Sequence, residues 1–528
     1  MGKIRFESWM LSFVGIVVVR IFLEQFSSFL PSRYVLIDAP TIIHYATFYL
    51  AVMAGVMAIF MVATKKSLQE ISILCLFGLV LLWLPPIIDL VFAGEGGFIM
   101  TYLFVSGREL LVRFFSFFGN HIAHGITLGI QVEIALFLIG SFVYVYLVTK
   151  KIFRAICATL GIYIFIFLLV AMPSIISLFL NGTEIFGSSF PGTSIYDSIA
   201  ASRMVSNNIS PGFSASTDRL LDLGFNKSLL GINLLVAVAG GLVVFFHGAR
   251  RKFIALMKNS RPERIIHFFL LFLFGAALAN VPFFKNWLDI QSYLLGFIAF
   301  ACAWMVCVCQ NDIYDEAIDA VSNATRPLIV KEVSREDLET ASKIFLLVAL
   351  LAAYAASHYV LFFTILFFSV YYLYSNPPFR LKRFVGLNSG LVSIACMAII
   401  LAGFFLTSPD KHITAIPFGM VLAIFIFFAT VSNIRDIKDV EGDRAQGIRT
   451  LPVLIGTRRA KALIAGMICF FFLALPWYLH LPQLLIPSFV ATILSWYFIT
   501  AKQYVEWKGF VVYMGYLVLV IMALIIQR

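Results

Sequence analysis

The chain has 528 residues, of which 61% are hydrophobic and 13% are charged, and its formal net charge is +11. Soluble globular domains contain about 45–50% apolar and about 25% charged residues, so this composition excludes a soluble protein. About fifteen apolar runs have the roughly 20-residue length that a helix needs to cross the hydrocarbon core of a bilayer. The sequence therefore predicts an all-α polytopic membrane protein.

The first region, residues 1–249, is expected to contain about six of these spans. They are predicted near residues 9–29, 41–64, 71–93, 125–149, 153–180 and 228–248. The segments 94–124 and 181–227 would then be long loops on the outer face. The first of these loops contains SGRELLVRFFSFF, in which Ser106 and Glu109 have the spacing of a capping box for an amphipathic helix lying at the membrane interface.

Four ionisable residues fall inside the apolar runs of this first region: Arg20, Glu24, Asp89 and Glu133. Ionisable groups in membrane spans are functional candidates, although structural polar pairs between helices explain them equally well. A separate transport or transferase activity stays open for this region. We therefore define residues 1–249 as an N-terminal transmembrane region of unknown function.

A basic connector, residues 250–264, leads into a second region at 265–528. Nine further spans are predicted there, near residues 265–283, 290–310, 342–357, 359–375, 387–406, 415–433, 460–477, 483–501 and 509–527. With the connector in the cytoplasm, the opposite face of this region carries only Lys285, Lys411 and Arg528 among its many basic residues. The positive-inside rule therefore predicts this orientation.

Two aspartate triplets follow the second and the sixth of these nine spans, so both are expected on the cytoplasmic face. The triplets are Asp312, Asp315 and Asp319 and, 124 residues later with the same spacing, Asp436, Asp439 and Asp443. Steps of three and four residues on a helix place the side chains of one triplet on one stripe. Six carboxylates gathered in this way would repel one another unless a cation held them. Oxygen ligands without His or Cys indicate Mg²⁺, and a substrate diphosphate is the predicted partner of that metal.

Between the triplets, the segment YYLYSNPPFRLKRFVGLN adds Arg380, Lys382 and Arg383 to the same face. Cations there can hold the outer oxygens of a diphosphate and neutralise its charge as it leaves. The positive-inside rule alone would also supply such residues. We take Lys382 as the stronger functional candidate and Tyr374 as a weaker one.

The two aspartate segments carry a resemblance to a known family. NDIYDEAID, residues 311–319, and DIKDVEGD, residues 436–443, resemble the two signatures of the UbiA superfamily of intramembrane prenyltransferases. The resemblance covers residues about 265–528 and implies a nine-helix bundle around a cavity that opens to lipid, with Mg²⁺ between the aspartate motifs. It also implies transfer of a polyprenyl group from its diphosphate to an aromatic carbon or a hydroxyl oxygen of a lipophilic acceptor. The expected partners are these two substrates and the lipid bilayer, without nucleic acid, and the active site is expected on the cytoplasmic face.

Carried over residue by residue, the resemblance assigns roles to individual side chains. The catalytic set that it implies is Asn311, Asp312, Asp315, Asp319, Asp436, Asp439 and Asp443. All of these except Asp312 would be metal ligands. Diphosphate binding would involve Arg326, Lys382 and Arg449, with Tyr374 as a further candidate.

The acceptor and the length of the prenyl chain stay open. The segment SNATRPL, residues 322–328, stands where members that accept phosphoribose have His-Pro-x-Lys, which counts against such an acceptor. YSNPPFRLK is close to the pattern of members that act on large ring acceptors and on lipids. Two other classes remain as alternatives. A CDP-alcohol phosphotransferase would need Asp-Gly-x-x-Ala-Arg, which neither triplet has, and a polytopic cation transporter would be expected to carry acidic residues in mid-membrane.

Overall fold

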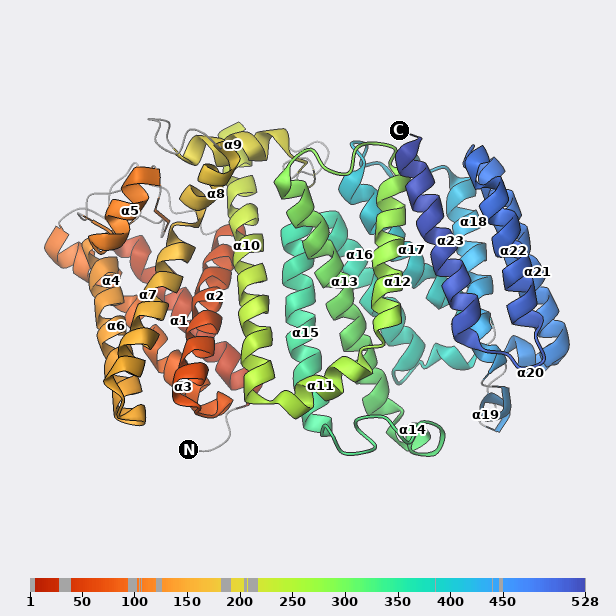
Figure 1. The fold of residues 1–528 in the computed structure, drawn as a ribbon, viewed down its shortest axis with the longest axis horizontal. Coiled ribbons are helices and arrows are strands. Elements are labelled where there is room, and N and C mark those ends of the chain that lie inside the picture. The colour runs from red at the N-terminus through yellow and green to blue at the C-terminus, as the bar shows by residue number, and fades with distance from the viewer. Residues whose placement is uncertain are drawn as a thin grey trace. The chain divides into compact units, whose positions relative to one another are not determined.

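The computed structural model of the chain is helical, and no strand occurs among the residues that it describes (Figure 1). The described residues are 5–27, 39–93, 102–103, 105, 107–119, 126–181, 191–203, 207, 217–384, 386–438, 440–445 and 450–527. The chain folds as two compact units. Unit 1 comprises Met1–Val205 and Ser214–Phe253, and unit 2 comprises Ser206–Phe213 and Ile254–Arg528.

Unit 1 contains six of the helical segments that are long and apolar enough to cross a membrane, at the places predicted from the sequence. Its elements are α1 (Phe6–Ser27), α2 (Ala39–Thr64), α3 (Leu68–Gly78), η1 (Leu79–Trp83), α4 (Leu84–Ile88), η2 (Asp89–Ala93), α5 (Gly107–Phe115), α6 (Leu128–Thr149), α7 (Ile152–Val170), α8 (Met172–Asn181), α9 (Pro191–Ala201) and α10 (Thr217–Gly248). Helix α5 confirms a helix in the first long loop, whereas Ser106 lies outside the described residues. Helix α11 (Arg250–Asn259) then crosses the boundary between the units.

Two segments of unit 1 differ in detail from what the sequence predicted. The span expected at 153–180 is two helices, because α7 ends at Val170 and Pro173, which has no backbone N–H, lies in the first turn of α8. The segment 181–227 is not a loop throughout, since it contains α9 and the first turns of α10. These polar turns of α10 are anchored to α2, where the His44 Nδ1 lies 2.9 Å from the Asn226 Oδ1.

Unit 2 contains nine long helices among its described residues, and each lies where a span was predicted. The elements are α12 (Pro262–Leu278), α13 (Trp287–Tyr314), α14 (Glu316–Ser322), α15 (Arg335–Ala356), α16 (His358–Ser375), η4 (Leu381–Arg383), α17 (Leu387–Thr407), η5 (Ile413–Ala415), α18 (Phe418–Val431), η6 (Ser432–Ile437), α19 (Val440–Ala445), α20 (Leu451–Ile455), α21 (Thr457–Tyr478), η7 (Pro482–Leu484), α22 (Leu485–Thr500) and α23 (Glu506–Ile526).

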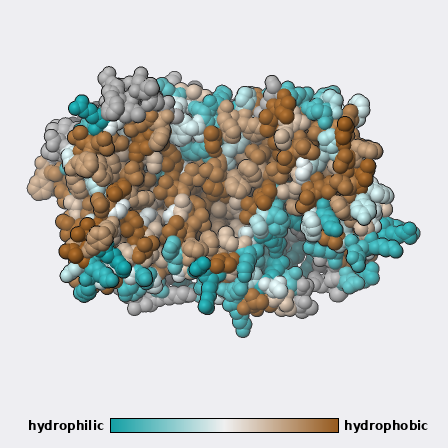
Figure 2. Space-filling model, in the orientation of Figure 1, coloured by the Kyte–Doolittle hydropathy of each residue, from teal (hydrophilic) through white to brown (hydrophobic). Residues whose placement is uncertain are grey.

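In total, 13 helical segments of the described chain qualify as membrane spans by length and composition, against the fifteen predicted. The two that fall short are apolar helices at their predicted places, α12 with 17 residues and α18 with 14 residues. Figure 2 shows hydrophobic residues covering the helix faces, while hydrophilic residues gather at the lower edge, where Figure 1 places α14 and α19. These features define an integral, multi-pass membrane protein.

Small residues and aromatic rings hold the helices of unit 2 together. A Cβ atom on Gly275 of α12 would lie 1.8 Å from the carbonyl oxygen of Ile400 in α17, so only glycine allows this close approach of the two backbones. Beside this contact, Phe268 packs edge-on against both Trp304 of α13 and Phe367 of α16. The core formed in this way fixes the helix ends on which the candidate site is built.

Residues 206–213 of unit 2 precede the connector in the sequence, and Asn207 is the one among them that the structure describes. Asn207 is 2% exposed, and its Nδ2 donates to the carbonyl oxygen of Leu406 at 3.0 Å. Its Oδ1 accepts from the Lys411 Nζ at 2.6 Å, and its carbonyl oxygen accepts from the Ser357 Oγ at 3.0 Å. Ser357 directly follows α15, Leu406 lies in the last turn of α17, and Lys411 follows that helix, so all three are at the end of unit 2 opposite α14. We call this set of contacts the Asn207 anchor.

Candidate active site

The first aspartate triplet lies where α13 ends and α14 begins. Asp312 is in the last turn of α13, Asp315 is the residue between the two helices, and Asp319 is in α14. The three residues are 2%, 7% and 4% exposed, so they are not the solvated acids of an ordinary helix end. Buried carboxylates need cationic or hydrogen-bonding partners, and the structure supplies them from several elements.

Arg326 joins the first and the last aspartate of the triplet. Its guanidinium forms an ion pair with Asp312, and its Nε lies 3.3 Å from the Asp319 Oδ2. The Asn323 Nδ2 donates to the other oxygen of Asp319 at 2.9 Å. The loop after α14 therefore folds back over the triplet and places Arg326 on it.

The middle aspartate is paired with two cations from the segment after α16. Arg380 and Lys382 contact the two different oxygens of the Asp315 carboxylate, and the Lys382 Nζ lies 2.7 Å from Oδ2. Burial lowers the pKa of Lys382, and the neighbouring Asp315 carboxylate opposes that effect. The exposed Arg383 has no ion pair among the described residues, so the structure separates it from the other two cations.

Several site residues were missed by sequence reasoning. Asn259, from the segment that was interpreted only as a basic connector, donates its Nδ2 hydrogen to the Asp312 Oδ2 at 2.5 Å, and the Arg261 guanidinium lies 3.8 Å from Oδ1. The Ser375 Oγ donates to the Asn311 Oδ1 at 3.1 Å and so ties the end of α16 to α13. The polar Asn259 within a run of cations was the one available signal.

The second triplet is described only in part. Asp436 lies in η6 and lines a cavity of about 70 Å³ together with Tyr374, Arg264 and Glu506. Asp439 and Arg449 lie outside the described residues, and of Asp443 only the backbone position in α19 is described. The structure thus brings Tyr374 and Asp436 to one cavity.

The beginning of α23 holds the segment that carries Asp436. Glu506 receives the Arg264 guanidinium at 3.1 Å and the Lys438 Nζ at 2.5 Å, one on each carboxylate oxygen. The Tyr504 hydroxyl donates to the carbonyl oxygen of Ile434 at 3.2 Å. Arg264 and Glu506 are thus further polar residues around this cavity that sequence reasoning did not single out.

The donor chemistry of the first triplet fits a hard divalent cation. The aspartates of the triplet offer only oxygen atoms as metal ligands. Arg and Lys side chains neutralise these carboxylates, which shows that positive charge is required there. The Asp319 Oδ2 is buried, and in the described chain it has the ion pair with Arg326 but no hydrogen bond. Among the described residues, no group of three or more His, Cys, Asp or Glu is arranged to hold a metal ion. The first triplet can thus supply ligands, but not a complete cage.

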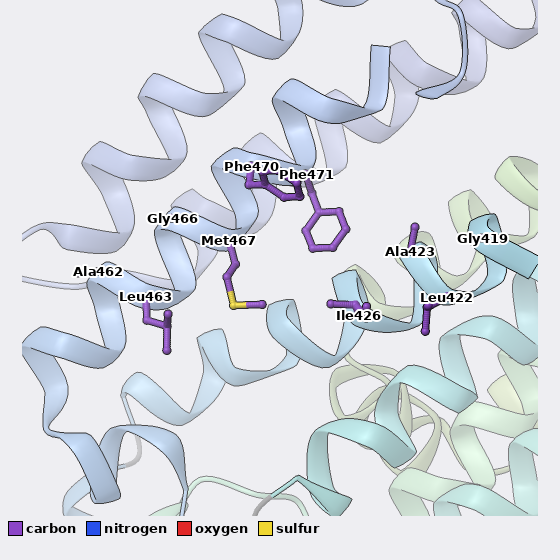
Figure 3. Close-up of a pocket in the computed structure, with 10 residues that line it drawn as sticks. All are labelled: Gly419, Leu422, Ala423, Ile426, Ala462, Leu463, Gly466, Met467, Phe470 and Phe471. Carbon is purple, nitrogen blue, oxygen red and sulfur yellow. The ribbon is translucent and has the colours of Figure 1, made fainter. Parts of the chain in front are cut away.

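Another hollow of unit 2 lies away from the two triplets. A groove of about 570 Å³ between α18 and α21 is lined by apolar residues, among them Gly419, Ile426, Met467 and Phe471 (Figure 3). It contains none of the predicted site residues. Because its lining is apolar and lacks those residues, its size alone does not mark the reaction centre.

The fold and the buried acidic cluster define a polytopic membrane protein with a charged centre at its helix ends. The sequence profile described as the UbiA prenyltransferase family matches residues 268–511. The chain is 30% identical over 223 residues to the digeranylgeranylglyceryl phosphate synthase of Pyrococcus furiosus, covering 40% of this chain and 72% of that protein. The chain therefore belongs to the UbiA prenyltransferase family.

Other relatives are matched over shorter parts. The chain is 30% identical over 216 residues to a probable homogentisate phytyltransferase of Oryza sativa subsp. japonica, covering 37% of this chain and 53% of that protein. It is 31% identical over 167 residues to the chlorophyll synthase of Arabidopsis thaliana, covering 30% of this chain and 42% of that protein. The chain thus spans about half the length of these two relatives. A UbiA homolog from Archaeoglobus fulgidus, solved with GPP and Mg²⁺, is 20% identical with a TM-score of 0.39, over 51% of this chain and 99% of that one.

Proposed function

We propose that the protein is a Mg²⁺-dependent intramembrane prenyltransferase. It would move a polyprenyl group from a prenyl diphosphate to an aromatic carbon or a hydroxyl oxygen of a lipophilic acceptor. The observation that carries this proposal is the cluster of Asp312, Asp315 and Asp319 buried at the end of a membrane helix and paired with Arg326, Arg380 and Lys382. Membership of the family supports it.

In the proposed reaction, the bond between C1 of the prenyl chain and the diphosphate oxygen breaks. The diphosphate leaves with the electron pair, the acceptor attacks the allylic cation, and the acceptor loses a proton. When bound, Mg²⁺ would neutralise the leaving diphosphate, and Asn311, Asp315, Asp319, Asp436, Asp439 and Asp443 are its proposed ligands.

The chain's own cations have a complementary part in this proposal. Arg326, Arg380 and Lys382 now neutralise the aspartates, and the same donors can move to the phosphate oxygens when substrate and metal arrive. Arg449 is proposed as a further diphosphate ligand, and Tyr374 as a wall residue of the cavity that Asp436 shares. The names of the relatives include homogentisate, chlorophyll and a glyceryl phosphate, so the acceptor is proposed only as a class. The active site is proposed to lie on the cytoplasmic face.

The test is prenyl transfer by the purified full-length chain with Mg²⁺, labelled geranylgeranyl diphosphate and a panel of lipophilic acceptors, with the product identified by mass. Asp315→Asn should lower turnover at least about 100-fold, the scale for losing one preorganised electrostatic group. Glu316→Gln is the matched control, because Glu316 is the exposed neighbour of Asp315 and should be dispensable. Full turnover in EDTA, or by Asp315→Asn, would contradict the proposal.

A further inference from the structure

Unit 1 encloses a cavity within its membrane-spanning helices. The cavity has a volume of about 80 Å³ and lies among α1, α2, α6, α7 and the α3–η1 segment. Its wall is mostly apolar, with Phe48, Val52, Met53, Ile134 and Phe137 among the lining residues. Four residues of the wall carry ionisable groups, Arg20, Tyr49, Cys75 and Glu133, and none of them is part of the proposed prenyltransferase site.

Arg20 is held firmly and still has an unused donor. It is 3% exposed, its Nη2 lies 2.6 Å from the Glu24 Oε1, and its Nη1 donates to the carbonyl oxygen of Leu82 at 2.8 Å. The Nε–H is buried without a hydrogen-bond partner among the described residues. A buried donor without an acceptor is unfavourable, so this group is available to a bound molecule.

Glu133 supplies the complementary acceptor. It lies in the second turn of α6, and the described part of the chain offers its carboxyl group no hydrogen bond and no ion pair, only the longer-range influence of Arg20 and Glu24. Asp89 in the same unit differs, because its Oδ1 accepts a hydrogen bond from the backbone N–H of Gly129 at 2.8 Å. Glu133 is therefore the acidic residue in the cavity wall whose hydrogen-bonding capacity is unfilled.

We propose that this cavity binds the polar head of a lipophilic alcohol or phenol. The hydroxyl oxygen accepts a hydrogen bond from the Arg20 Nε–H, and the hydroxyl hydrogen is donated to the Glu133 carboxyl group. The apolar wall contacts the first carbons of the ligand. Because the volume is well below the roughly 300–1,000 Å³ of sites that enclose a whole ligand, the rest of the chain lies outside the cavity.

The chemistry of the wall disfavours charged ligands. A hard cation takes about six or more oxygen ligands, whereas Glu133 is the single carboxyl group that contributes to this wall without a partner. An anion would meet one guanidinium already paired with Glu24, together with the carboxyl group of Glu133. A neutral hydroxyl group satisfies both unused groups at once, because it donates and accepts.

The proposal is tested by photolabelling the full-length chain in lipid nanodiscs with hexadecanol that carries a diazirine near its head and an alkyne tag. The methyl ether of the same probe, which cannot donate a hydrogen bond, is the chemical control. Labelling by the alcohol should saturate, map to peptides of α2 and α6, and exceed labelling by the ether about tenfold, the effect of one buried hydrogen bond.

Two variants locate the site. Glu133→Leu removes the acceptor, and Val52→Phe fills the cavity while leaving Arg20 and Glu133 in place, so each should reduce saturable labelling about tenfold. Ile139→Leu, at an exposed position of α6, should label as the unaltered protein does. If Glu133→Leu fails to fold, as judged by gel filtration and thermal melting, Val52→Phe decides the question.

Equal labelling by the alcohol and the ether, or unchanged labelling of the folded Val52→Phe variant, would overturn the proposal and leave a cavity filled by water. The readout is binding to unit 1, so it does not depend on prenyl transfer. Loss of turnover in Asp315→Asn and loss of labelling in Glu133→Leu are separate results.

Discussion

At the scale of single residues, Asn259 has a specific role that its place in a basic segment conceals. Its amide donates to a buried Asp312 oxygen, so Asn259→Leu should leave that oxygen with one donor fewer and lower kcat/KM for the prenyl diphosphate about tenfold. The Mg²⁺ concentration required for half-maximal turnover should change as well. Steady-state kinetics over a Mg²⁺ series measures both. Lys258→Leu, at the exposed neighbouring position, should change neither, and equal behaviour of the two variants would remove Asn259 from the site.

Arg380 and Arg383 provide a second matched pair. Arg380 contacts Asp315 and is partly buried, whereas Arg383 is exposed. We expect Arg380→Gln to raise KM for the prenyl diphosphate and to lower kcat by about 10–100-fold, because one cation near the leaving diphosphate is lost. Arg383→Gln should retain turnover close to that of the unaltered protein. A similar loss in both variants would indicate a general effect of positive charge on this face.

The part of the candidate site that could be predicted from sequence spacing is the repeated aspartate motif. The spacing of Asp312, Asp315 and Asp319 pointed to a shared face, and the structure places all three at the junction of α13 and α14. The partners of these aspartates could not be found in this way. Asn259 is 53 residues away from Asp312, and the tertiary fold brings the end of α11 to the end of α13, so no local pattern predicts this contact.

At the scale of the elements, the loops at the two ends of unit 2 define the orientation. The loop between α14 and α15 and the loop between α17 and α18 lie at opposite ends, because α15, α16 and α17 alternate in direction. In a variant without the seven native cysteines, Asp410→Cys should react with an impermeant maleimide in intact cells and Ala324→Cys should not. Both positions are exposed. Labelling of Ala324→Cys alone would place the aspartates on the outer face.

The long apolar helices were predictable, and their interruptions were not. Hydrophobic runs of about 20 residues mark spans whatever their packing, because the bilayer core sets that length. The break after α7 depends on tertiary partners instead. The carbonyl oxygen of Val170 accepts from the backbone N–H of Leu103 at 2.8 Å, and the Ser174 Oγ donates to the carbonyl oxygen of Leu103 at 2.6 Å. A segment about 70 residues earlier in the chain thus provides hydrogen-bond partners at the interruption between α7 and α8.

At the scale of the whole molecule, every proposed prenyltransferase residue follows Ala249. We therefore predict that a fragment of residues 249–528 inserts into membranes and retains prenyl transfer, since its helices satisfy their own backbone hydrogen bonds. The fragment lacks Asn207, so its melting temperature should be lower than that of the full chain. Turnover and thermal melting of the two proteins in the same detergent provide the comparison. A well-folded fragment without turnover would contradict this division and assign part of the active site to residues 1–248.

A point variant isolates the contribution of the Asn207 anchor. In the full-length chain, Asn207→Leu should lower the stability of unit 2 by about 1–3 kcal/mol. The reason is that the carbonyl oxygen of Leu406 and the Nζ of Lys411 each lose the hydrogen bond to Asn207. Prenyl transfer at low temperature should persist, since the anchor lies at the end opposite the aspartates. A full-length Asn207→Leu protein that melts as the unaltered chain does would show that the Asn207 anchor does not stabilise unit 2.

Because of the Asn207 anchor, the parts of unit 2 cannot be assembled in the order in which they are synthesised. Asn207 precedes its partners Ser357, Leu406 and Lys411 by 150, 199 and 204 residues. At about 5–20 residues per second, the ribosome completes the last of these partners about 10–40 s after Asn207 has been made. Until then Asn207 cannot make all three contacts, and the later helices must insert and pack before the anchor is complete. The last unit of the chain to be synthesised is therefore completed by one of its older residues.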